Sequence, residues 1–528
     1  MQLFLHKTLS ILILSSLMLI SACGGSGGNT DTTSFGEGTS TTSTLPTWTA
    51  GEFTKDADLK NLCIGQSNGS ALTEKLWLRS WSDNTYLWYN EVDDKDPAPY
   101  NVLEYFAQLK TTATTASGKN KDQFHFSVPT EEWELSSQSG ASVGHGINYH
   151  IQFPDSEQNI PVKITVTYTE PNSPANENNL TRGATIVAVD GVNIAMVNSN
   201  EEMNTISNGL FPEKPGQITV LTVQDLGVES TRDITLVAKT IVSTPVQNVK
   251  TAITDNGKMG YLLFNSHIAT AEKGLVDAIT QLKAENVNEL VIDLRYNGGG
   301  LLAIASQLGY MVAGDATENK IFNKLTFNDK HPNIHPVTGR FLEPEPFYNE
   351  TIGFNADLLE AGQPLPTLNL TRLFVLTGSG SCSASESLMN GLRGINVEVI
   401  QIGSTTCGKP YGFSAAPNCG TTYFSIQFKG ENELGFGDYA DGFVPAESPL
   451  HPNEVQGCMV NDDFSHTLGD ENEALFSTAI NYANNPGTCP EFTSSTSTKQ
   501  IPSKSSFFIE DKRVQSLINR NQIMTFKY

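Results

Sequence analysis

A serine and a lysine at close range are the residues of this chain best suited to chemistry. Ser383 lies in Gly-Ser-Cys-Ser-Ala-Ser-Glu-Ser (380–387), where a predicted strand over 372–377 turns into a helix. Lys409 follows 26 residues later, after that helix and a second predicted strand over 397–402. Backbone N–H groups at a helix start can hold an oxyanion, and a desolvated lysine amine can act as the base for a serine. The spacing therefore predicts a serine–lysine pair at one edge of a sheet.

The position of Ser383 also has a purely structural interpretation. Ser383 and Glu386 form the S-x-x-E pattern of a capping box, which can exist only to start a helix. A single lysine such as Lys409 is, taken alone, typical of the surface. Residue type also does not separate Ser383 from its neighbours Ser379, Ser381, Ser385 and Ser387.

The elements around these residues predict a mostly parallel sheet with crossover helices. A strand over 260–265, a helix over 269–284 and a strand over 289–293 precede Asn297-Gly298-Gly299-Gly300, which opens a helix over 301–312. A strand, a triple glycine and a helix could also form a phosphate loop. However, no Lys-Ser/Thr follows the glycines and the G-x-G-x-x-G pattern is absent, so nucleotide binding is not expected.

Two further units precede this region. Aromatic and aliphatic residues recur at helical spacing over 72–91 and 102–110, which predicts a small helical unit with an aromatic core. Over residues 137–239 the sequence consists of short runs in which apolar and polar residues alternate. Turn residues separate these runs, which is typical of a β-rich domain. The predicted strands cover 162–168, 185–189, 217–223 and 233–237.

The N-terminus has the layout of an export signal. Lys7 precedes an apolar run over 9–20, which is too short to span a bilayer comfortably. The ending Ile20-Ser21-Ala22-Cys23 resembles the lipobox of bacterial lipoproteins, which implies lipidation of Cys23; a plain signal peptide with a chance cysteine is the alternative. Gly24 in place of aspartate favours the outer membrane, facing the periplasm or the cell surface. The Gly/Ser/Thr-rich stretch that follows is predicted to be a flexible tether.

Composition and cysteines narrow the remaining possibilities. The net charge of −24 without a Lys/Arg cluster makes nucleic acid an unlikely partner. An even number of cysteines beyond Cys23 suggests disulfides in an exported chain, and Cys407–Cys419 is one candidate pair. The cysteine spacings do not resemble a zinc site, and neither a metal nor a cofactor is expected. The six cysteines are Cys63, Cys382, Cys407, Cys419, Cys458 and Cys489.

The order of glycine motifs in the β-rich region resembles a PDZ domain of the bacterial protease type. Gly144-His145-Gly146-Ile147 is followed by Ser173-Pro174-Ala175 and by a strand that starts near Gly183. In PDZ domains such a loop offers N–H groups to the C-terminal carboxylate of a peptide, beside an edge strand. The resemblance implies Gly146 and Ile147 as peptide-binding residues, although a PDZ-like module can also serve only as a scaffold.

Three motifs in order resemble the carboxyl-terminal processing, or tail-specific, serine peptidases: Asp293-Leu294-Arg295-Tyr296-Asn297-Gly298-Gly299-Gly300, Ser383-Ala384-Ser385-Glu386 and Gly408-Lys409. The resemblance implies Ser383 as nucleophile and Lys409 as general base, with the N–H groups of Ala384 and Gly299 as the oxyanion hole. Asp293 and Arg295 are expected to shape the turn. One departure stands out, because many members have glutamine four residues after the lysine and this chain has Phe413.

The implied fold is multidomain α+β, with a helical N-terminal unit, a PDZ-like β-rich domain and an α/β (crotonase-like ββα) peptidase core. The expected limits are 1–22 signal peptide, 23–56 tether, 57–134 helical unit, 135–245 PDZ-like domain, 246–490 catalytic domain and 491–528 linker and tail.

The predicted function is that of a lipid-anchored serine endopeptidase acting on exported polypeptides. A Ser-His-Asp hydrolase is a weaker interpretation: His451 and His466 follow the serine, but no G-x-S-x-G elbow is present. His331 and His335 each precede a proline, so they do not form a helical metal pair. The rival from another class is a catalytically weak or inactive lipoprotein that binds peptides or small molecules. No pattern in the sequence predicts an oligomeric state.

Overall fold

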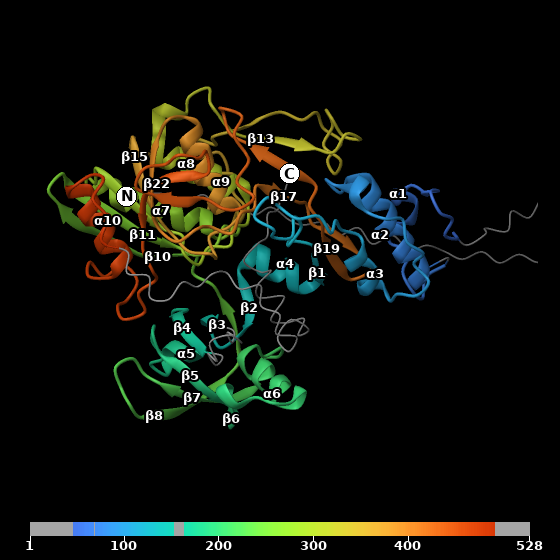
Figure 1. The fold of residues 1–528 in the computed structure, drawn as a ribbon, viewed down its shortest axis with the longest axis horizontal. Coiled ribbons are helices and arrows are strands. Elements are labelled where there is room, and N and C mark those ends of the chain that lie inside the picture. The colour runs from blue at the N-terminus through green and yellow to red at the C-terminus, as the bar shows by residue number, and fades with distance from the viewer. Residues whose placement is uncertain (1–45, 68, 153–162, 492–528) are drawn as a thin grey trace, which may run out of the picture. The chain divides into compact units, whose positions relative to one another are not determined.

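A seven-stranded sheet forms the centre of the C-terminal half of the protein (Figure 1). The computed structural model describes residues 46–67, 69–152 and 163–491. The predicted signal peptide, Cys23 and the C-terminal tail lie outside these residues. Among the helices of the described ranges, none is both long and apolar enough to cross a membrane.

The central sheet is mostly parallel, as the alternating pattern predicted. Only its first pair, β10 with β11, is antiparallel; all the other neighbours run parallel. In spatial order the strands are β10 (Val246–Thr254), β11 (Gly257–Phe264), β12 (Glu289–Asp293), β15 (Arg372–Thr377), β16 (Glu398–Gly403), β22 (Glu454–Met459) and β21 (Val444–Ala446).

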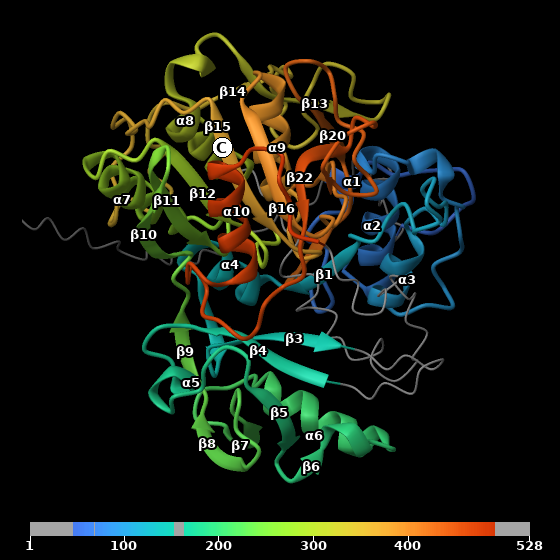
Figure 2. The same cartoon turned by 60° about the vertical axis from the view of Figure 1, so that its left-hand side comes forward.

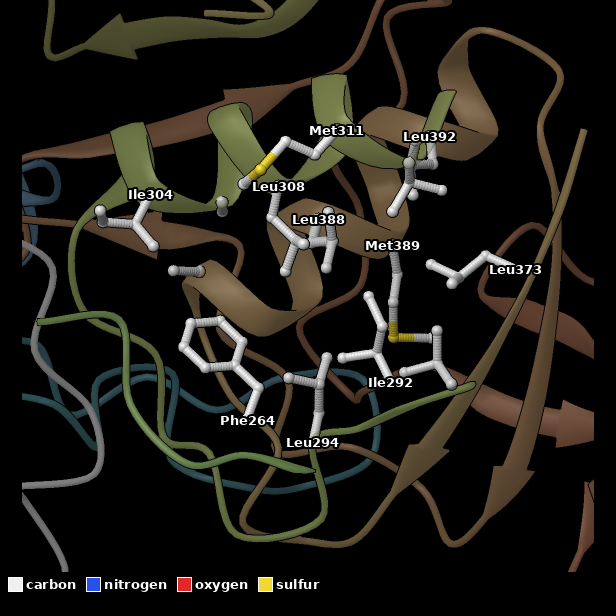
Figure 3. Close-up of a cluster of buried hydrophobic side chains, with 14 of the residues drawn as sticks. Phe264, Ile292, Leu294, Ile304, Leu308, Met311, Leu373, Leu388, Met389 and Leu392 are labelled. Carbon is white, nitrogen blue, oxygen red and sulfur yellow. The ribbon is translucent and has the colours of Figure 1, made fainter. Parts of the chain in front are cut away.

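Helices cover both faces of this sheet because its strands are apolar on both sides. Alternate residues of a strand point to opposite faces. Leu373 and Val375 accordingly join one buried cluster, and Phe374 and Leu376 join the other. The first cluster includes residues of α7 (Ala271–Ala284), α8 (Leu302–Ala313) and α9 (Ala384–Gly394), and Figure 3 shows its centre. The second includes residues of α10 (Ala474–Asn484), which lies across the sheet in Figure 2.

A separate antiparallel sheet, with its own apolar core, forms the PDZ-like domain. Its strand order is β3-β4-β5-β7-β8, with β6 paired to β5, so β3 lies at an edge. The strands are β3 (Ile147–Gln152), β4 (Lys163–Thr169), β5 (Thr185–Val189), β6 (Val192–Asn193), β7 (Ile218–Gln224) and β8 (Thr231–Val237). The helices are α5 (Pro174–Glu177), η2 (Ile194–Met196) and α6 (Asn200–Leu210), and the flanking pair is β2 (Ala141–Gly144) with β9 (Lys239–Val242).

The helical N-terminal segment packs its aromatic residues into a core of its own, as predicted. It is also joined to the C-terminal half, because β1 pairs with β19 and Cys63 is bonded to Cys419. Its elements are α1 (Asp56–Leu59), α2 (Ala71–Thr85), η1 (Tyr89–Glu91), α3 (Val102–Gln108), β1 (Phe126–Pro129) and α4 (Thr130–Ser139).

Two small sheets complete the described structure. One has the order β1-β19-β18, with β18 (Ala416–Asn418) and β19 (Thr421–Phe424). The other has the order β14-β13-β20-β17, with β13 (Ile321–Phe327), β14 (Glu345–Pro346), β17 (Tyr411–Gly412) and β20 (Phe428–Glu431), after η3 (Gly314–Thr317). The predicted fold class, multidomain α+β, is thereby confirmed, while the exact domain limits stay a prediction.

Candidate active site

Ser383 lies directly before the first residue of α9, in a backbone conformation that few side chains tolerate. Its φ is 62° and its ψ is −114°, and a positive φ is rare for a residue with a Cβ. The side chain is fully buried, and among the described residues its hydroxyl has no hydrogen-bond partner. Residues held in strained conformations cluster at active sites. Ser383 is also the N-cap of α9, where it and Glu386 have the arrangement of the predicted capping box, so the position fits both a nucleophile and a helix cap.

Glu386 holds the backbone of Ser383 and of the predicted base together. Its carboxylate accepts the N–H of Ser383 at 2.9 Å, which is one half of the predicted capping box. It also accepts the N–H groups of Gly408 and Lys409, both at 2.9 Å, and the hydroxyl of Thr406 at 2.5 Å. Burial raises the pKa of Glu386, against the opposing effect of these four donors. The serine and lysine motifs therefore meet at one buried carboxylate.

A disulfide joins the same two segments covalently. Cys382, next to the serine, is bonded to Cys407, two residues before the lysine. The expected pair Cys407–Cys419 is wrong, because Cys419 lies at the turn between β18 and β19 and bonds to Cys63 instead. The remaining pair is Cys458–Cys489. The Cys382 and Cys407 sulfurs lie near Glu386, but a disulfide supplies no thiolate for a metal.

The glycine run lies against the serine, as its predicted role requires. Gly299 has a φ of 100° and Gly300 a φ of 135°. A Cβ built on Gly299 would lie 2.7 Å from the Cβ of Ser383 and 2.9 Å from the backbone nitrogen of Ala384. Only glycine fits both this backbone conformation and this approach. The structure thus brings together Gly299, Ser383 and Ala384.

The two predicted oxyanion donors differ in their present partners. Ala384 is the first residue of α9, where an N–H group has no acceptor within the helix. The N–H of Gly299 donates to Oδ1 of Asn297 at 2.9 Å. That oxygen also accepts from Nδ1 of His267 at 3.0 Å, while Nδ2 of Asn297 donates to the carbonyl of Phe264 at 2.8 Å. Gly299 can serve as a donor only if its N–H turns from Asn297 or is shared with it.

His267 is a residue of this site that the sequence reasoning missed. Its backbone N–H donates to the carbonyl of Gly299 at 3.0 Å. Its ring is fully buried, and burial lowers its pKa to about 4, so the imidazole is neutral at physiological pH. Because Oδ1 of Asn297 is an acceptor, the proton lies on Nδ1. The only available signal was its place just after β11, one of the strands of the central sheet.

Lys409 is fully buried, which is the condition that its predicted role demands. Burial lowers its pKa well below the ordinary value, and the charges of Asp122 and Glu386 partly oppose this. Its Nζ lies 4.2 Å from the ring centroid of Phe413 and 4.8 Å from that of Phe124. Phe413, where the family resemblance implies a glutamine, therefore contacts the amine through its ring. Because the hydroxyl of Ser383 has no partner, the serine and the lysine are not hydrogen bonded in this structure.

Arg295 and Asp293 brace the turn before the glycines, as expected. Arg295 is buried and donates to both oxygens of Glu473 at 2.7 and 3.0 Å. It also donates to Asp293 at 3.0 Å and to Asp462 at 2.8 Å. These contacts occupy the guanidinium within the protein interior, which fits a structural role.

The residues predicted to bind a peptide lie at the edge of the PDZ-like sheet. Gly146 has a φ of 74°, and a Cβ there would lie 2.2 Å from the Cβ of Ser173, so glycine is needed. Ile147 is the first residue of edge strand β3. The histidines of the alternative hydrolase interpretation do not bond to the serine, since its hydroxyl has no partner; His466 instead contacts Asp463 at 2.7 Å.

A cavity of about 230 Å³ lies between α4 and the segments that carry the predicted site. Leu301, which follows the glycine run, and Ala415, which lies shortly after Phe413, both line this cavity. Trp133 of α4 adds an aromatic side. The cavity therefore borders the glycine run, while Ser383 and Lys409 are buried and do not line it.

Comparison with known proteins supports this fold. Residues 258–417 match the family model of Peptidase family S41. This range contains all three motifs. The resemblance to carboxyl-terminal processing peptidases is confirmed.

Two curated proteins and one solved structure are similar to this chain. A carboxyl-terminal-processing protease of Picosynechococcus sp. is 26% identical over 239 residues, covering 45% of this chain and 49% of that protein. The chloroplastic carboxyl-terminal-processing peptidase 2 of Arabidopsis thaliana is 25% identical over 280 residues, covering 52% and 47%. The chain thus spans about half the length of these curated relatives. A putative S41 protease from Bacteroides fragilis has the same fold, with a TM-score of 0.56, 23% identity and coverage of 77% of this chain and 96% of that one.

Proposed function

We propose that this protein is a serine endopeptidase that cleaves exported polypeptides with Ser383 as nucleophile and Lys409 as general base. One observation carries the proposal. Among the described residues the hydroxyl of Ser383 has no hydrogen-bond partner, its backbone has a strained positive φ, and the residue packs against the glycine run. The backbone N–H of Lys409, whose amine is buried, donates to the same carboxylate, Glu386, as the backbone N–H of Ser383. The match to Peptidase family S41 over these motifs supports the proposal.

In this mechanism the neutral amine of Lys409 takes the hydroxyl proton as Ser383 Oγ attacks the scissile carbonyl. The tetrahedral oxyanion is held by the N–H of Ala384 and by a second donor from the glycine run. The ammonium then gives its proton to the leaving amine, and an acyl-enzyme ester remains. Water, deprotonated by the same amine, hydrolyses the ester and restores Ser383.

Proteolysis of an unfolded protein by purified enzyme tests this proposal. Ser383→Ala and Lys409→Ala should each lower kcat/KM by about 10³-fold or more, since the two residues act as one unit. Ser379→Ala is the matched control, because Ser379 is an exposed serine of the same segment and should retain wild-type activity. Equal cleavage by wild type and Ser383→Ala would contradict the proposal and favour a binding lipoprotein on the same fold.

We further propose that the PDZ-like domain presents substrate tails. Edge strand β3 has a side on which a peptide strand can pair, and the turn at Gly146 precedes it, as β-strand addition requires. Peptides with a free C-terminal carboxylate should then be cleaved faster than the same peptides with a C-terminal amide. Equal rates for the two would contradict tail recognition but leave the peptidase activity standing.

The membrane anchor remains a proposal from the sequence, since Cys23 lies outside the described residues. Lipidation there would hold the enzyme at a membrane, facing the periplasm or the cell surface. A Cys23→Ser variant should move from the membrane fraction to the soluble fraction of the cells that produce it. An unchanged distribution would contradict the anchor.

A further inference from the structure

The base has an aromatic environment that comes from two distant parts of the chain. Phe413 follows Lys409 by four residues, whereas Phe124 belongs to the segment just before β1. Both ring centroids lie within 5 Å of Nζ, at 4.2 and 4.8 Å. This is inside the range at which a ring face attracts a cation.

The position of Phe124 is fixed by a buried hydrogen-bond chain. Its N–H donates to Oδ1 of Asp122 at 2.9 Å, and the hydroxyl of Tyr86 donates to Oδ2 of Asp122 at 2.7 Å. The N–H of Thr111 in turn donates to the hydroxyl of Tyr86 at 3.1 Å. These residues are all buried. The N-terminal segment therefore holds one ring at the amine.

Phe413 is fixed by packing against other rings. It contacts Phe424 with centroids 5.2 Å apart and Phe126 at 5.9 Å, and Phe126 stacks on Phe424 at 4.6 Å. The pairing of β1 with β19 brings these rings together, because Phe126 is opposite Phe424 in the register. The same strand pairing thus places both Phe124 and Phe413 beside Lys409.

We propose that the ring faces of Phe124 and Phe413 position the Lys409 amine and stabilise the ammonium that forms when it takes the Ser383 proton. The inference rests on the proposed function. A neutral amine gains little from a ring face, whereas an ammonium is attracted to it. The rings therefore favour the state reached during proton transfer over the resting state, which is what accelerates a step. In this chain Phe413 stands at the position where the family resemblance implies glutamine.

The titratable groups near the amine are consistent with these effects on Lys409. The carboxyl groups near Lys409 are those of Asp122, from the segment before β1, and Glu386, from α9. His125, which follows Phe124 in the chain, has a buried ring, and burial lowers its pKa to about 4, so it carries no charge near neutral pH. Burial favours the neutral form of Lys409, whereas the carboxyl groups and the rings favour its charged form. A ring attracts an ammonium only when its face is turned toward it. This effect therefore differs from ordinary apolar packing, which any aliphatic side chain could supply.

The test is the pH profile of kcat/KM for Phe124→Leu and Phe413→Leu. Activity rises with pH as Lys409 loses its proton. Leucine keeps the site apolar but removes the ring face, so the ammonium is less stable and the rise should move to lower pH by about half a unit or more. The plateau should fall at least about threefold for the same reason. A shift to higher pH would mean that the rings only exclude water, and that outcome or an unchanged profile would overturn the inference.

Phe322→Leu is the matched control. Phe322 is a buried phenylalanine of another core cluster, where its ring packs against Phe347, and it makes no cation–π contact with Lys409 among the described residues. Its loss should lower stability while leaving the pH profile in place. A shift as large as that of Phe124→Leu would also overturn the inference.

A second measurement is independent of activity. The native pKa of Lys409 is lowered, so between that pKa and the unfolded value of about 10.4 the unfolded chain binds more protons, and the free energy of unfolding rises with pH. Lys409→Met should lack this rise, and in Phe124→Leu it should begin at a lower pH. Equal cleavage by wild type and Ser383→Ala would contradict the proposed function, whatever the unfolding data show for Lys409. An unmoved rise in Phe124→Leu would sink this inference alone.

Discussion

At the scale of single residues, the site depends on backbone positions that only a glycine or a constrained residue can occupy. Ser383 keeps a positive φ although it carries a side chain. Glu386 stabilises that conformation by accepting its N–H. Gly299 lies so close that no side chain fits between it and the serine. The nucleophile and the glycine run therefore constrain each other sterically.

Gly299→Ala should abolish most activity. Its Cβ would meet Ser383 and the Ala384 nitrogen at 2.7 and 2.9 Å, and its φ of 100° strains any side chain. Displacing the oxyanion donors should lower kcat/KM by about 10²–10³-fold, with a loss of about 1–3 kcal/mol in the free energy of unfolding from strain. Steady-state kinetics and denaturant unfolding measure both.

The control for this substitution is Gly435→Ala. Gly435 has a φ of 78°, but a Cβ there meets nothing within 4 Å. It should lose stability through backbone strain and keep its activity per folded molecule. Full activity in Gly299→Ala would show that the glycine run does not contact the reacting carbonyl.

At the scale of elements, the site lies where β15 ends, α9 begins and the segment after β16 returns. Parallel strands with crossover helices bring these ends to one edge of the sheet. Two links then set the spacing of the serine and lysine segments. One is the carboxylate of Glu386, and the other is the disulfide between Cys382 and Cys407.

Removing that disulfide should affect activity more than stability alone explains. The variant Cys382→Ala/Cys407→Ala opens a loop with a sequence separation of 25, which should cost about 3–4 kcal/mol of the free energy of unfolding. Because the bond joins the serine and lysine segments, we also expect kcat/KM per folded molecule to fall about tenfold or more.

The chain supplies a matched pair for comparison. Cys458–Cys489 closes a loop of similar length, with a sequence separation of 31, away from the serine and lysine motifs. Its double alanine variant should lose comparable stability and retain its activity per folded molecule. Equal activity losses in the two variants would argue that the Cys382–Cys407 bond has no positioning role.

At the scale of the whole molecule, an ionic cluster of two buried arginines and a partly exposed aspartate joins the PDZ-like domain to the peptidase core. Arg182, just before β5, donates to Asp462 at 2.6 Å and to the hydroxyl of Tyr296 at 2.6 Å. Arg295 of the core donates to the same oxygen of Asp462 at 2.8 Å. One carboxylate therefore lies between an arginine of each domain.

Arg182→Met should destabilise the protein by about 1–3 kcal/mol near neutral pH, because Asp462 loses one of its two arginine partners. Burial would raise the pKa of Asp462, but Arg295 and Arg182 lower it below the ordinary value. The stability that this pair supplies is therefore present above the unfolded pKa of about 3.9 and is lost as pH falls through the lower native pKa. The difference from wild type should shrink at acid pH, as unfolding measured across pH would show.

Arg232→Met is the control at this scale. Arg232 forms a partly exposed ion pair with Asp225 within the PDZ-like domain. Such pairs contribute at most about 1 kcal/mol. A loss of stability as large as that of Arg182→Met would mean that the ionic cluster between the domains stabilises the protein no more than a surface ion pair does.

Much of the core followed from local patterns. The strands over Glu289–Asp293 and Arg372–Thr377 have the predicted limits, and the helix that starts at Ala384 begins where expected. Runs of apolar residues fix such elements because their side chains must be buried on both faces of the sheet. The glycine run and the serine could be placed in the same way, since both lie at the ends of these strands.

The pairing of cysteines could not be predicted in this manner. Cys407 and Cys419 are near in sequence, yet each bonds to a residue from another part of the chain. A disulfide requires its two Cα atoms to come within a few ångströms, which depends on the packed structure and not on spacing along the chain. His267 and Asn297 were likewise joined only by the return of the chain to one edge of the sheet.

Local patterns were enough to identify the residues suited to chemistry: the serine, the lysine, the glycines and their order. The surroundings of the lysine depend on the packing of distant segments, because Phe124 lies 285 positions before Lys409 and reaches it through the pairing of β1 with β19. Sequence patterns report on neighbours along a strand or helix, whereas the pKa of a buried amine depends on whatever packs around it. The sequence shows that residue 413 is phenylalanine where the family resemblance implies glutamine. It does not show that two rings contact the amine of Lys409.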